Sequence, residues 1–509
     1  MTDTAESGRV VRAGETCWRT ARADRLGVIV DAADYFAAAR AAMLQADETI
    51  VLIGWDFDLR IRLAPGKDLD DAPNELGPFL KYLVRRKPRL RIFILKWDMA
   101  VLFTGNQLLP IFALDLKSVA RIRLRFDSKH PWGAAHHQKI AVIDDALAFC
   151  GGIDMTVDRW DTREHAPHDE RRRRPDGSVA GPWHDATTVV DGAAAQALGE
   201  VARARWKAAT GRRLPWSRVP RRIWPEGIEP QLFDVDVGIA RTMPKFRGRP
   251  PISEIEKLYL AAIKAAQRSI YLESQYFASA SICDALEARL AEPDGPEVVV
   301  INPLSTEGWL EQETMGVSRD LRLASVTRAD RNDRFRIYYP VNAAGEPIYV
   351  HAKILVVDDD LIRVGSSNVN NRSMGFDTEC DLAVEARGPA ERTAITALRN
   401  DLLAEHLDVR PADIREALNR TGSLRGAIEA LRRTEGRSLR PIPRREMTPM
   451  EEAVARTHFA NPERPADPEA RLEHLAKGLV LSVPPEAWVA VGVATTAAAF
   501  YFYRRRKKR

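Results

Sequence analysis

Two histidine–lysine pairs stand in matching contexts at two distant places in the sequence. "HQKIAVID" begins at His137 and "HAKILVVD" begins at His351, and each histidine is followed two residues later by a lysine, Lys139 or Lys353. Residues two apart on an extended strand point to the same face, so each pair projects an imidazole and an ammonium group together. The apolar run after each pair predicts a buried strand that anchors it. If both pairs face one cleft, the clustered cations require an anion, and a phosphodiester fits.

These residue types suit phosphoryl transfer without a metal ion. A neutral imidazole can attack phosphorus while a second, protonated imidazole donates a proton to the leaving oxygen. The lysines offset the charge that develops on the non-bridging oxygens, so we expect no cofactor and no metal at this site. Water or an alcohol would then cleave the phosphohistidine, with the roles of the two imidazoles reversed.

Further candidates for substrate binding follow both pairs at the same spacing. A glycine lies 14 residues after each histidine. Seventeen residues after each histidine stands Asp154 in the first copy and Asn368 in the second. An amide can donate to a phosphate oxygen and an ionised carboxylate cannot, so we expect phosphate binding to be asymmetric. Ser366, which stands where the first copy has Gly152, adds to this asymmetry.

Four acidic side chains complete the candidate site. Asp144 and Asp358 end the two motifs and are counted with the catalytic candidates, although their place on the opposite face of a regular strand favours a turn role. Each histidine also needs a carboxylate behind it to fix its tautomer and bias its pKa. The candidate downstream of the first histidine is Asp185, and the candidate downstream of the second is Glu379.

The elements that must position these residues occur twice along the chain. Each half begins with a helical stretch and a strand, and continues with apolar runs typical of buried parallel strands. The matching segments are 34–58 and 258–277, 89–98 and 296–305, 121–130 and 334–343, and 136–154 and 350–368. The large offset between the copies indicates duplicated domains. We therefore predict an α/β fold with two duplicated α/β/α sandwich lobes packed face to face and a C-terminal helical extension.

Composition and periodicity divide the chain into five expected regions. They are a first lobe at 1–240 with a charged insertion at 155–182, a second lobe at 241–390, a helical extension at 391–436, a Pro- and charge-rich linker at 437–470, and an apolar tail helix with a basic end at 471–509.

The insertion and its surroundings are expected at the surface. The "RRRR" run at 171–174 predicts either a solvated loop or a contact for anionic lipid headgroups. His130, His136 and His165 are also expected to be surface residues.

The motifs resemble those of the phospholipase D superfamily. The resemblance covers roughly residues 30–390 and rests on the doubled HxKxxxxD motif with the GG and GSxN that follow it. "GGIDMTVDRWDTREH" (151–165) and "PWHD" (182–185) are similar to phosphatidylcholine-type phospholipases D. Two further similar segments are "SIYLESQYF" (269–277) and "NNRSMGFDTE" (370–379).

The resemblance implies a phosphodiesterase that hydrolyses glycerophospholipids to phosphatidate and a headgroup alcohol, with phosphatidyl transfer to an alcohol as a further outcome. It implies that His137 is the nucleophile and His351 the general acid. It also implies that Lys139, Lys353 and Asn368 bind the phosphate.

Three alternatives stay open at this point. A cardiolipin synthase-like phosphatidyl transferase would use the same site, although such synthases usually carry N-terminal membrane spans and lack an "RWDT" segment. A nuclease of the superfamily would bind nucleic acid, which a net charge of +5 over 509 residues does not demand. An inactive scaffold is disfavoured by the two intact His–Lys pairs. We expect a monomer, because both motifs lie in one chain, with a phospholipid substrate and no nucleic-acid partner.

The C-terminal tail suggests a membrane surface as a further partner. Residues 487–503 carry no charge, and "RRRKKR" (504–509) follows them. The stretch is short for a transmembrane helix, for which about 20 apolar residues are typical, and a helix lying in the interface or packed on the enzyme would use the same residues. We expect membrane association through this tail, on a side that the sequence does not assign. The start of the chain lacks the apolar segment of a signal peptide, and the Arg- and Ala-rich, Lys-poor composition favours a bacterial protein.

Overall fold

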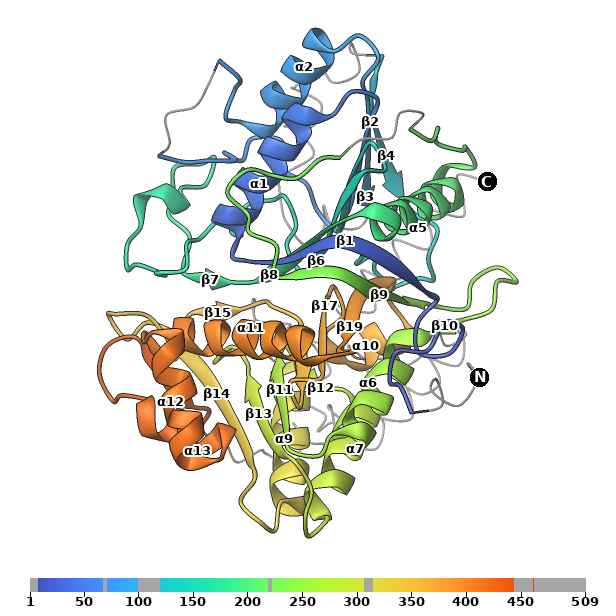
Figure 1. Ribbon diagram of the computed structural model, residues 1–509. Helices are drawn as coiled ribbons and strands as arrows, with labels where there is room; N and C mark the ends of the chain where they lie inside the picture. The colour runs from blue at the N-terminus through green and yellow to red at the C-terminus, as the bar shows by residue number, and fades with distance from the viewer. Residues whose placement is uncertain are drawn as a thin grey trace, which may run out of the picture.

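One long mixed β-sheet passes through both halves of the chain, as Figure 1 shows. The structure, a computed structural model, describes residues 8–66, 71–98, 120–217, 222–305, 315–443 and 461. In Figure 1 the first half, blue to green, lies above the second half, which runs from green to orange. The predicted α/β class is therefore confirmed.

The first half places its parallel strands at one end of the sheet. In spatial order its strands are β1 (Arg19–Val30), β8 (Ala186–Asp191), β6 (Leu147–Gly151), β5 (Ile140–Ile143), β2 (Thr49–Gly54), β3 (Arg91–Trp97) and β4 (Ile122–Asp127). β2, β3 and β4 pair in parallel, and β5 and β6 form an antiparallel hairpin. The sequence of β2, TIVLIG, is buried along its whole length, as expected for a parallel strand covered on both faces. The covering helices are α1 (Ala32–Gln45), α2 (Leu76–Arg86) and α5 (Gly192–Thr210).

The second half repeats this order strand by strand. Its strands are β9 (Leu232–Met243), β19 (Glu379–Glu385), β17 (Leu361–Gly365), β16 (Ile354–Val357), β11 (Ser269–Glu273), β13 (Glu297–Ile301) and β14 (Phe335–Val341), with β20 (Ser438–Pro441) added at the edge. β11, β13 and β14 again pair in parallel. The main helices are α6 (Glu254–Ala265), α7 (Ala280–Ala291), α9 (Val317–Ala329) and α11 (Pro389–Leu407). Every strand of the first half has a counterpart at the same place, which is the signature of the duplication.

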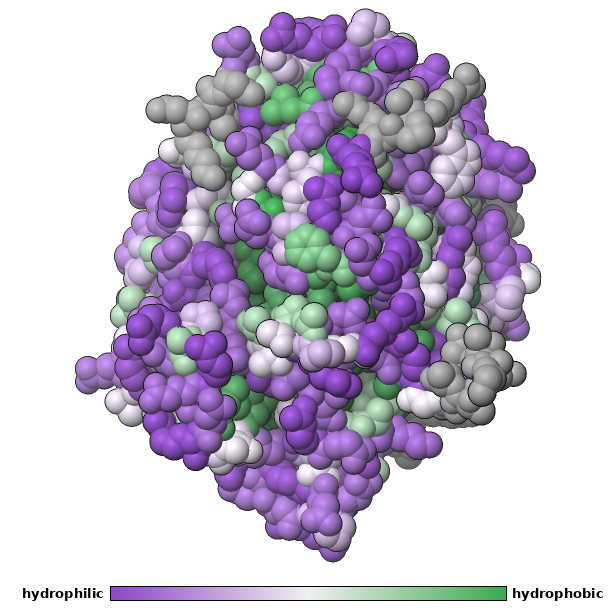
Figure 2. All heavy atoms as spheres, viewed as in Figure 1, coloured by the Kyte–Doolittle hydropathy of each residue, from purple (hydrophilic) through white to green (hydrophobic). Residues whose placement is uncertain are grey.

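β1 and β9 join the two halves edge to edge. They pair antiparallel along most of their length, from Arg19 opposite Ile239 to Leu26 opposite Leu232. Strands of the two halves also contact one another through their faces, β6 against β19 and β8 against β17, and one hydrophobic cluster contains residues of both halves. The lobes thus pack face to face, as predicted, and they share a continuous sheet, which the sequence pattern did not predict. In the view of Figure 2, hydrophobic residues are visible near the middle of the face, with hydrophilic residues around them.

Short elements complete the described fold and add further links between the halves. β7 (Trp183–His184) pairs in parallel with β15 (Tyr349–Val350), and β12 (Phe277–Ala278) pairs in parallel with β18 (Val369–Asn370). The other short elements are β10 (Ile252–Ser253), a 3₁₀ turn (Glu170–Arg172) and α10 (Asn371–Gly375). The pairing of β7 with β15 connects the first half directly to the second.

The expected regions differ in three places from the observed elements. β9 crosses residue 240, and α11 follows β19 as α5 follows β8, so by topology the second lobe extends beyond residue 390. The rest of the helical extension is α12 (Pro411–Thr421) and α13 (Leu424–Leu431). The region expected as a linker begins with β20, which pairs with β14. Residues 471–509, the expected tail, lie outside the described residues. Among the described residues, no helix has the length and hydropathy to cross a membrane.

Asp144 and Asp358 hold equivalent turns in the two halves. The carboxylate of Asp144 accepts hydrogen bonds from the backbone N–H groups of residues 47–49, 2.6–2.9 Å away, just before β2. Asp358 accepts from residues 267–269, 2.5–2.7 Å away, just before β11. This is the turn role that their strand position favours. Both carboxylates thus hold backbone turns, and their place among the catalytic candidates stays a prediction.

We predict that Asp358→Ala destabilises the fold by about 3 kcal/mol, because three backbone donors lose their acceptor. The turnover of the folded fraction should stay within about threefold of the unchanged protein. Thermal unfolding and activity at low temperature check the two expectations. Asp360→Ala is the matched control, because Asp360 forms an exposed ion pair with Arg392 and should change stability by less than about 1 kcal/mol. A catalytic role for Asp358 would instead lower turnover with stability unchanged.

Candidate active site

Strand-like contacts between the lobes bring the two His–Lys motifs to one junction. Residues 135–137, just before β5, pair with Thr378 of the second half: His137 N–H donates to Thr378 O at 3.0 Å, and Thr378 N–H donates to Ala135 O at 3.0 Å. The second motif contacts the first half in the same way: His351 N–H donates to His184 O at 2.7 Å. Each histidine therefore lies beside a segment of the opposite lobe.

The imidazole of His137 bonds to Glu379, which belongs to the second lobe. Its Nδ1 lies 2.9 Å from Glu379 Oε2. Two hydroxyl groups fix the same carboxylate: Ser366 Oγ donates to Oε2 at 2.5 Å and Ser373 Oγ donates to Oε1 at 2.8 Å. We call the pair His137–Glu379 the first dyad.

The imidazole of His351 bonds to Asp185, which belongs to the first lobe. Its Nδ1 lies 2.6 Å from Asp185 Oδ2, and the N–H of Ala186 donates to Asp185 Oδ1 at 2.7 Å. We call the pair His351–Asp185 the second dyad. In both dyads Nδ1 faces the carboxylate, which leaves Nε2 as the ring atom available to a substrate.

The pairing of histidines with carboxylates is thus the reverse of the expected one. The expectation joined each histidine to the acid downstream of it in the same half, Asp185 for the first and Glu379 for the second. In the structure each acid directly follows the residue that its lobe lays against the motif of the other lobe: Glu379 follows Thr378, and Asp185 follows His184. The crossing follows from the approximate twofold relation of the lobes, which spacing along one half does not reveal.

The two lysines differ in their partners. Lys139 Nζ lies 3.1 Å from Asp154 Oδ2, and both side chains are buried. Lys353 is fully buried and donates to His351 O, and no carboxylate among the described residues forms an ion pair with it. At the position equivalent to Asp154 stands Asn368, whose Oδ1 is buried and lacks a hydrogen-bond partner in the described part of the chain. The two lysines therefore have unequal partners at equivalent positions, and the asymmetric phosphate binding expected from the sequence stays a prediction.

Burial and mutual repulsion shape the protonation of the cluster. Burial, Lys139 and Lys353 together lower the pKa of His137 well below its usual value. Burial, Lys353 and Arg159 do the same to the pKa of His351. Burial raises the pKa of Glu379 to about 8 and that of Asp185 to about 7, and it lowers the pKa of Lys353 to about 7. The site therefore keeps its imidazoles neutral and carries less charge than its residue types suggest.

Two of the expected substrate-binding residues hold other site residues instead. Asp154 accepts from the backbone N–H of Trp55 at 2.9 Å and pairs with Lys139. Ser366 donates to Glu379 and accepts from the N–H of Cys380. Both side chains therefore contact other residues of the candidate site, and a direct contact with the substrate stays a prediction.

Sequence reasoning missed an aromatic and cationic wall beside His351. The ring of Trp183 stacks on Tyr349 with centroids 4.6 Å apart and lies 5.1 Å from the ring of His351. The guanidinium of Arg159 sits 4.1 Å above Trp183. The sequence did contain a signal for this wall, because Arg159 lies in the "RWDT" segment and Trp183 lies in the "PWHD" segment. Ser373 was also missed, although it lies in the "NNRSMGFDTE" segment.

The expected surface histidines and arginines are mostly engaged in structural contacts. His136 and His165 are completely buried, and the side chain of His130 is only 7% exposed, so the surface expectation was wrong for the first two. Each arginine of the 171–174 run pairs with a nearby carboxylate, and Arg172 is buried against Asp161. These ion pairs favour a structural role for the run over headgroup binding.

Gly152 shows why the two dyads are built differently. A Cβ added to Gly152 would lie 2.1 Å from Asp185 Oδ1, whereas the equivalent Ser366 uses its side chain to hold Glu379. We predict that Gly152→Ala displaces Asp185, misorients His351 and lowers turnover by about 10²-fold. Steady-state kinetics check this expectation, with unfolding temperature measured alongside.

Gly181→Ala is the matched control for Gly152→Ala. No atom lies within 4 Å of the Cβ that this change would add. Its turnover should equal that of the unchanged protein. Unchanged turnover in Gly152→Ala would contradict the proposed dependence of His351 on the position of Asp185.

Comparisons with known proteins show which proteins this chain is similar to. A family model described as "Cardiolipin synthase, PLD-like domain" matches residues 259–401. Phospholipase D A of Dictyostelium discoideum is 24% identical over 451 residues, covering 74% of this chain and 34% of that protein. Phospholipase D alpha 4 of Arabidopsis thaliana is 23% identical over 490 residues, covering 72% of this chain and 62% of that protein. The chain thus spans less than two thirds of the length of either relative.

A solved structure supports the fold. The crystal structure of phosphatidylserine synthase from Haemophilus influenzae Rd KW20 has a TM-score of 0.53 at 11% identity, and the match covers 81% of this chain and 96% of that one. The doubled motif, the family model and the curated relatives together support membership of this chain in the phospholipase D superfamily.

Proposed function

We propose that this chain hydrolyses glycerophospholipids to phosphatidate and a headgroup alcohol through a phosphohistidine intermediate. The observation that carries the proposal is the pair of crossed dyads, which gives two neutral imidazoles held by carboxylates beside two buried lysines. The names of the curated relatives, which are phospholipases D, support a phospholipid as the substrate.

Lys353 is the main phosphate ligand in this proposal. Burial lowers its pKa to about 7, and a phosphodiester brought beside it would restore the full positive charge of the ammonium group. Lys139 already shares its charge with Asp154, so it offers less to the substrate. The amide of Asn368 supplies a neutral donor to a non-bridging oxygen.

His137 is the nucleophile in this proposal, and His351 is the general acid. The side chain of His137 is 16% exposed and that of His351 is 6% exposed, which favours direct approach of the substrate to His137. A bond forms between His137 Nε2 and phosphorus, the bond from phosphorus to the headgroup oxygen breaks, and the second dyad gives its proton to that oxygen. Water then attacks phosphorus while the second dyad accepts the proton of the water, and the P–N bond breaks.

Phosphatidyl transfer is the second candidate function. The family model that matches residues 259–401 carries a cardiolipin synthase description, and the same intermediate would pass to an alcohol instead of water. Membrane association through the residues after 470 is part of both proposals, because both substrates are lipids. Nuclease activity of the same superfamily is the remaining alternative.

The proposal is tested on vesicles of phosphatidylcholine or phosphatidylglycerol and on single-stranded DNA, with and without a primary alcohol. We expect headgroup release from lipid, which His137→Ala and His351→Ala should each lower by about 10³-fold or more. His168→Ala is the control, because the side chain of His168 is 89% exposed and lies in the insertion. DNA cleavage without lipid turnover would contradict the proposal.

Two readouts of the same assay resolve the finer points. A product that carries the added alcohol, formed faster than phosphatidate, would favour the transferase. Mass spectrometry of a quenched reaction should find the phosphatidyl group on the peptide that contains His137. The same adduct on the peptide of His351 would reverse the two roles.

The raised pKa values of the two carboxylates predict a bell-shaped dependence of kcat/KM on pH. Attack requires His137 Nε2 without a proton, so the rate should rise as pH increases through the pKa of the first dyad, which burial sets to about 8 at Glu379. Protonation of the leaving oxygen requires a proton on the second dyad. The rate should therefore fall as pH increases through the pKa of about 7 that burial gives Asp185.

The maximum should lie between the two values, near neutral pH. Initial rates at fixed ionic strength across the neutral range check this expectation. Asp185→Asn should remove the falling limb from the residual activity. A rate that is constant between acidic and alkaline pH would contradict the assignment of both limbs.

A further inference from the structure

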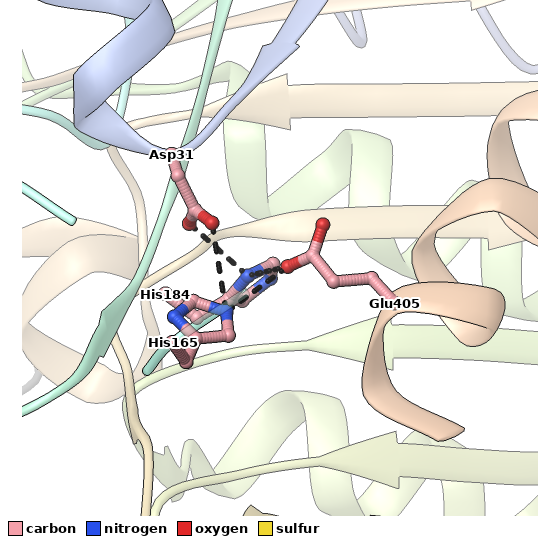
Figure 3. A group of neighbouring side chains, drawn as sticks. All are labelled: Asp31, His165, His184 and Glu405. Atoms are coloured by element: carbon pink, nitrogen blue, oxygen red, sulfur yellow. Dashed lines mark hydrogen bonds and ion pairs between the residues drawn. The ribbon is translucent and has the colours of Figure 1, made fainter. Parts of the chain in front are cut away.

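A second cluster of buried histidines and carboxylates lies behind the second dyad. Figure 3 shows its members pointing toward one another: Asp31 before α1, His165 in the insertion, His184 in β7 and Glu405 in α11. All four are buried, and they come from three distant regions of the sequence, near residues 31, 165–184 and 405. None of them belongs to the two dyads, so the proposed reaction leaves their chemistry unexplained.

The spacing of the four side chains fits a tetrahedral metal site. His184 Nδ1 lies 2.9 Å from Glu405 Oε1 and 3.3 Å from Asp31 Oδ1. His165 Nε2 lies 3.2 Å from Glu405 Oε1 and 3.5 Å from Asp31 Oδ2. Ligands bound tetrahedrally at about 2.0–2.1 Å are about 3.3 Å from one another. With Asp31 Oδ2 as the ligand atom, the separations of 2.9, 3.2 and 3.5 Å that join it, the two imidazoles and Glu405 Oε1 bracket that value. One ligand atom from each of the four residues can be chosen so that all lie within 4.8 Å of one another.

Each imidazole in the cluster is held from behind by a further carboxylate. His165 Nδ1 lies 2.9 Å from Asp161 Oδ2, and His184 Nε2 lies 2.8 Å from Glu273 Oε2. In metal sites the ring nitrogen that does not bind the metal usually donates to a carboxylate, which fixes the tautomer and aims the other nitrogen at the ion. Both histidines have this arrangement.

One buried oxygen of the cluster lacks a hydrogen-bond donor. Asp31 Oδ2 is buried and has no hydrogen-bond partner among the described residues, and Figure 3 shows the carboxylate directed at the two imidazoles. Burying a carboxylate oxygen without a donor or a cation is costly. The nearest imidazole nitrogen, His165 Nε2, is 3.5 Å from this oxygen, beyond hydrogen-bond geometry, so a cation at the centre of the cluster would stabilise the oxygen.

The charges of the surrounding residues leave room for a divalent cation. The nearby carboxylates are Asp31, Asp161, Glu273 and Glu405. The nearby guanidinium groups are Arg163, which pairs with Glu405 and with the half-exposed Asp401, and Arg172, which pairs with Asp161. With neutral histidines, the four buried carboxylates exceed these two guanidinium groups by two negative charges even before Asp401 is counted. One divalent ion or two protonated imidazoles would neutralise this excess.

We propose that Asp31, His165, His184 and Glu405 bind one divalent transition metal of the zinc class at a closed structural site. Two imidazoles and two carboxylates in a small tetrahedron suit Zn²⁺ better than Mg²⁺ or Ca²⁺, which prefer six or more oxygen ligands. All four positions of the tetrahedron are protein ligands, which is typical of structural zinc sites and leaves no place for a substrate.

The site would set the position of Asp185 without touching the reacting atoms. Asp31 N–H donates to Asp185 O at 2.8 Å, and Asp185 N–H donates to Asp31 Oδ1 at 3.1 Å. A metal bound to Asp31 would therefore fix the backbone that carries the carboxylate of the second dyad. It would also tie α11 and the insertion to the start of α1.

The test is metal analysis of the full-length chain, purified without a histidine tag and without chelators. We expect about one zinc-class ion per chain after desalting. Removal with dipicolinate should lower the unfolding temperature by about 5–10 °C, and ZnCl₂ should restore it while MgCl₂ does not. Co²⁺ added to the metal-free chain should give the intense visible bands of a tetrahedral complex.

Matched variants locate the ion. Glu405→Gln and His165→Gln should each lower the metal content at least tenfold. His406→Gln should retain it, because the buried His406 contacts Glu273 at 3.2 Å and is outside the four ligands. If the two ligand variants fail to fold, the Co²⁺ spectrum and Zn²⁺ titration of the unchanged chain decide.

The proposal is overturned if the unchanged chain contains no metal and its unfolding temperature responds neither to Zn²⁺ nor to the chelator. Two protonated imidazoles would then hold the cluster. Equal metal content in Glu405→Gln, His165→Gln and the unchanged chain would also overturn it, because the ion would lie elsewhere.

Discussion

Each imidazole of the candidate active site depends on a carboxylate that the other half of the chain supplies. Glu379 reaches His137 from the second lobe, and Asp185 reaches His351 from the first. Neither half therefore contains a complete dyad. The continuous sheet through β1 and β9 and the pairing of β7 with β15 have a direct chemical consequence, because they set the register at which each carboxylate meets its imidazole.

The crossed arrangement makes the junction of the lobes expensive to build. Two lysines, two carboxyl groups and two imidazoles are removed from water within one cluster, and burying charge is favourable only when partners compensate it. The protein reduces the cost by holding the imidazoles neutral and raising the pKa values of Glu379 and Asp185. An anionic substrate would relieve the remaining imbalance, since it supplies the negative charge that Lys353 lacks.

The sequence predicted what depends on local periodicity and failed where contacts join distant segments. The repeated apolar runs identified the parallel strands of both halves. His137 and Lys139 lie just before β5 and not within it, so the argument from strand parity does not describe their placement. The crossed dyads were missed because the order of acids along one half says nothing about which lobe they face. His165 was assigned to the surface because its neighbours are charged, yet its partner Glu405 lies 240 residues away in α11. Charged and polar residues can be buried when they form hydrogen bonds and ion pairs with one another. The pattern of one segment does not show which distant residues will provide those partners.

The differences between the two copies of the motif give a nearly symmetric scaffold the asymmetry that the proposed reaction requires. Asp154 neutralises Lys139, whereas Asn368 leaves the charge of Lys353 available. Ser366 holds Glu379 by donating a hydrogen bond, while Gly152 leaves the space that Asp185 occupies. Two single-residue differences at equivalent positions thus give the imidazoles unequal surroundings. Displacement at phosphorus needs one group that attacks and another that donates a proton, so a strictly symmetric pair would serve neither role as well.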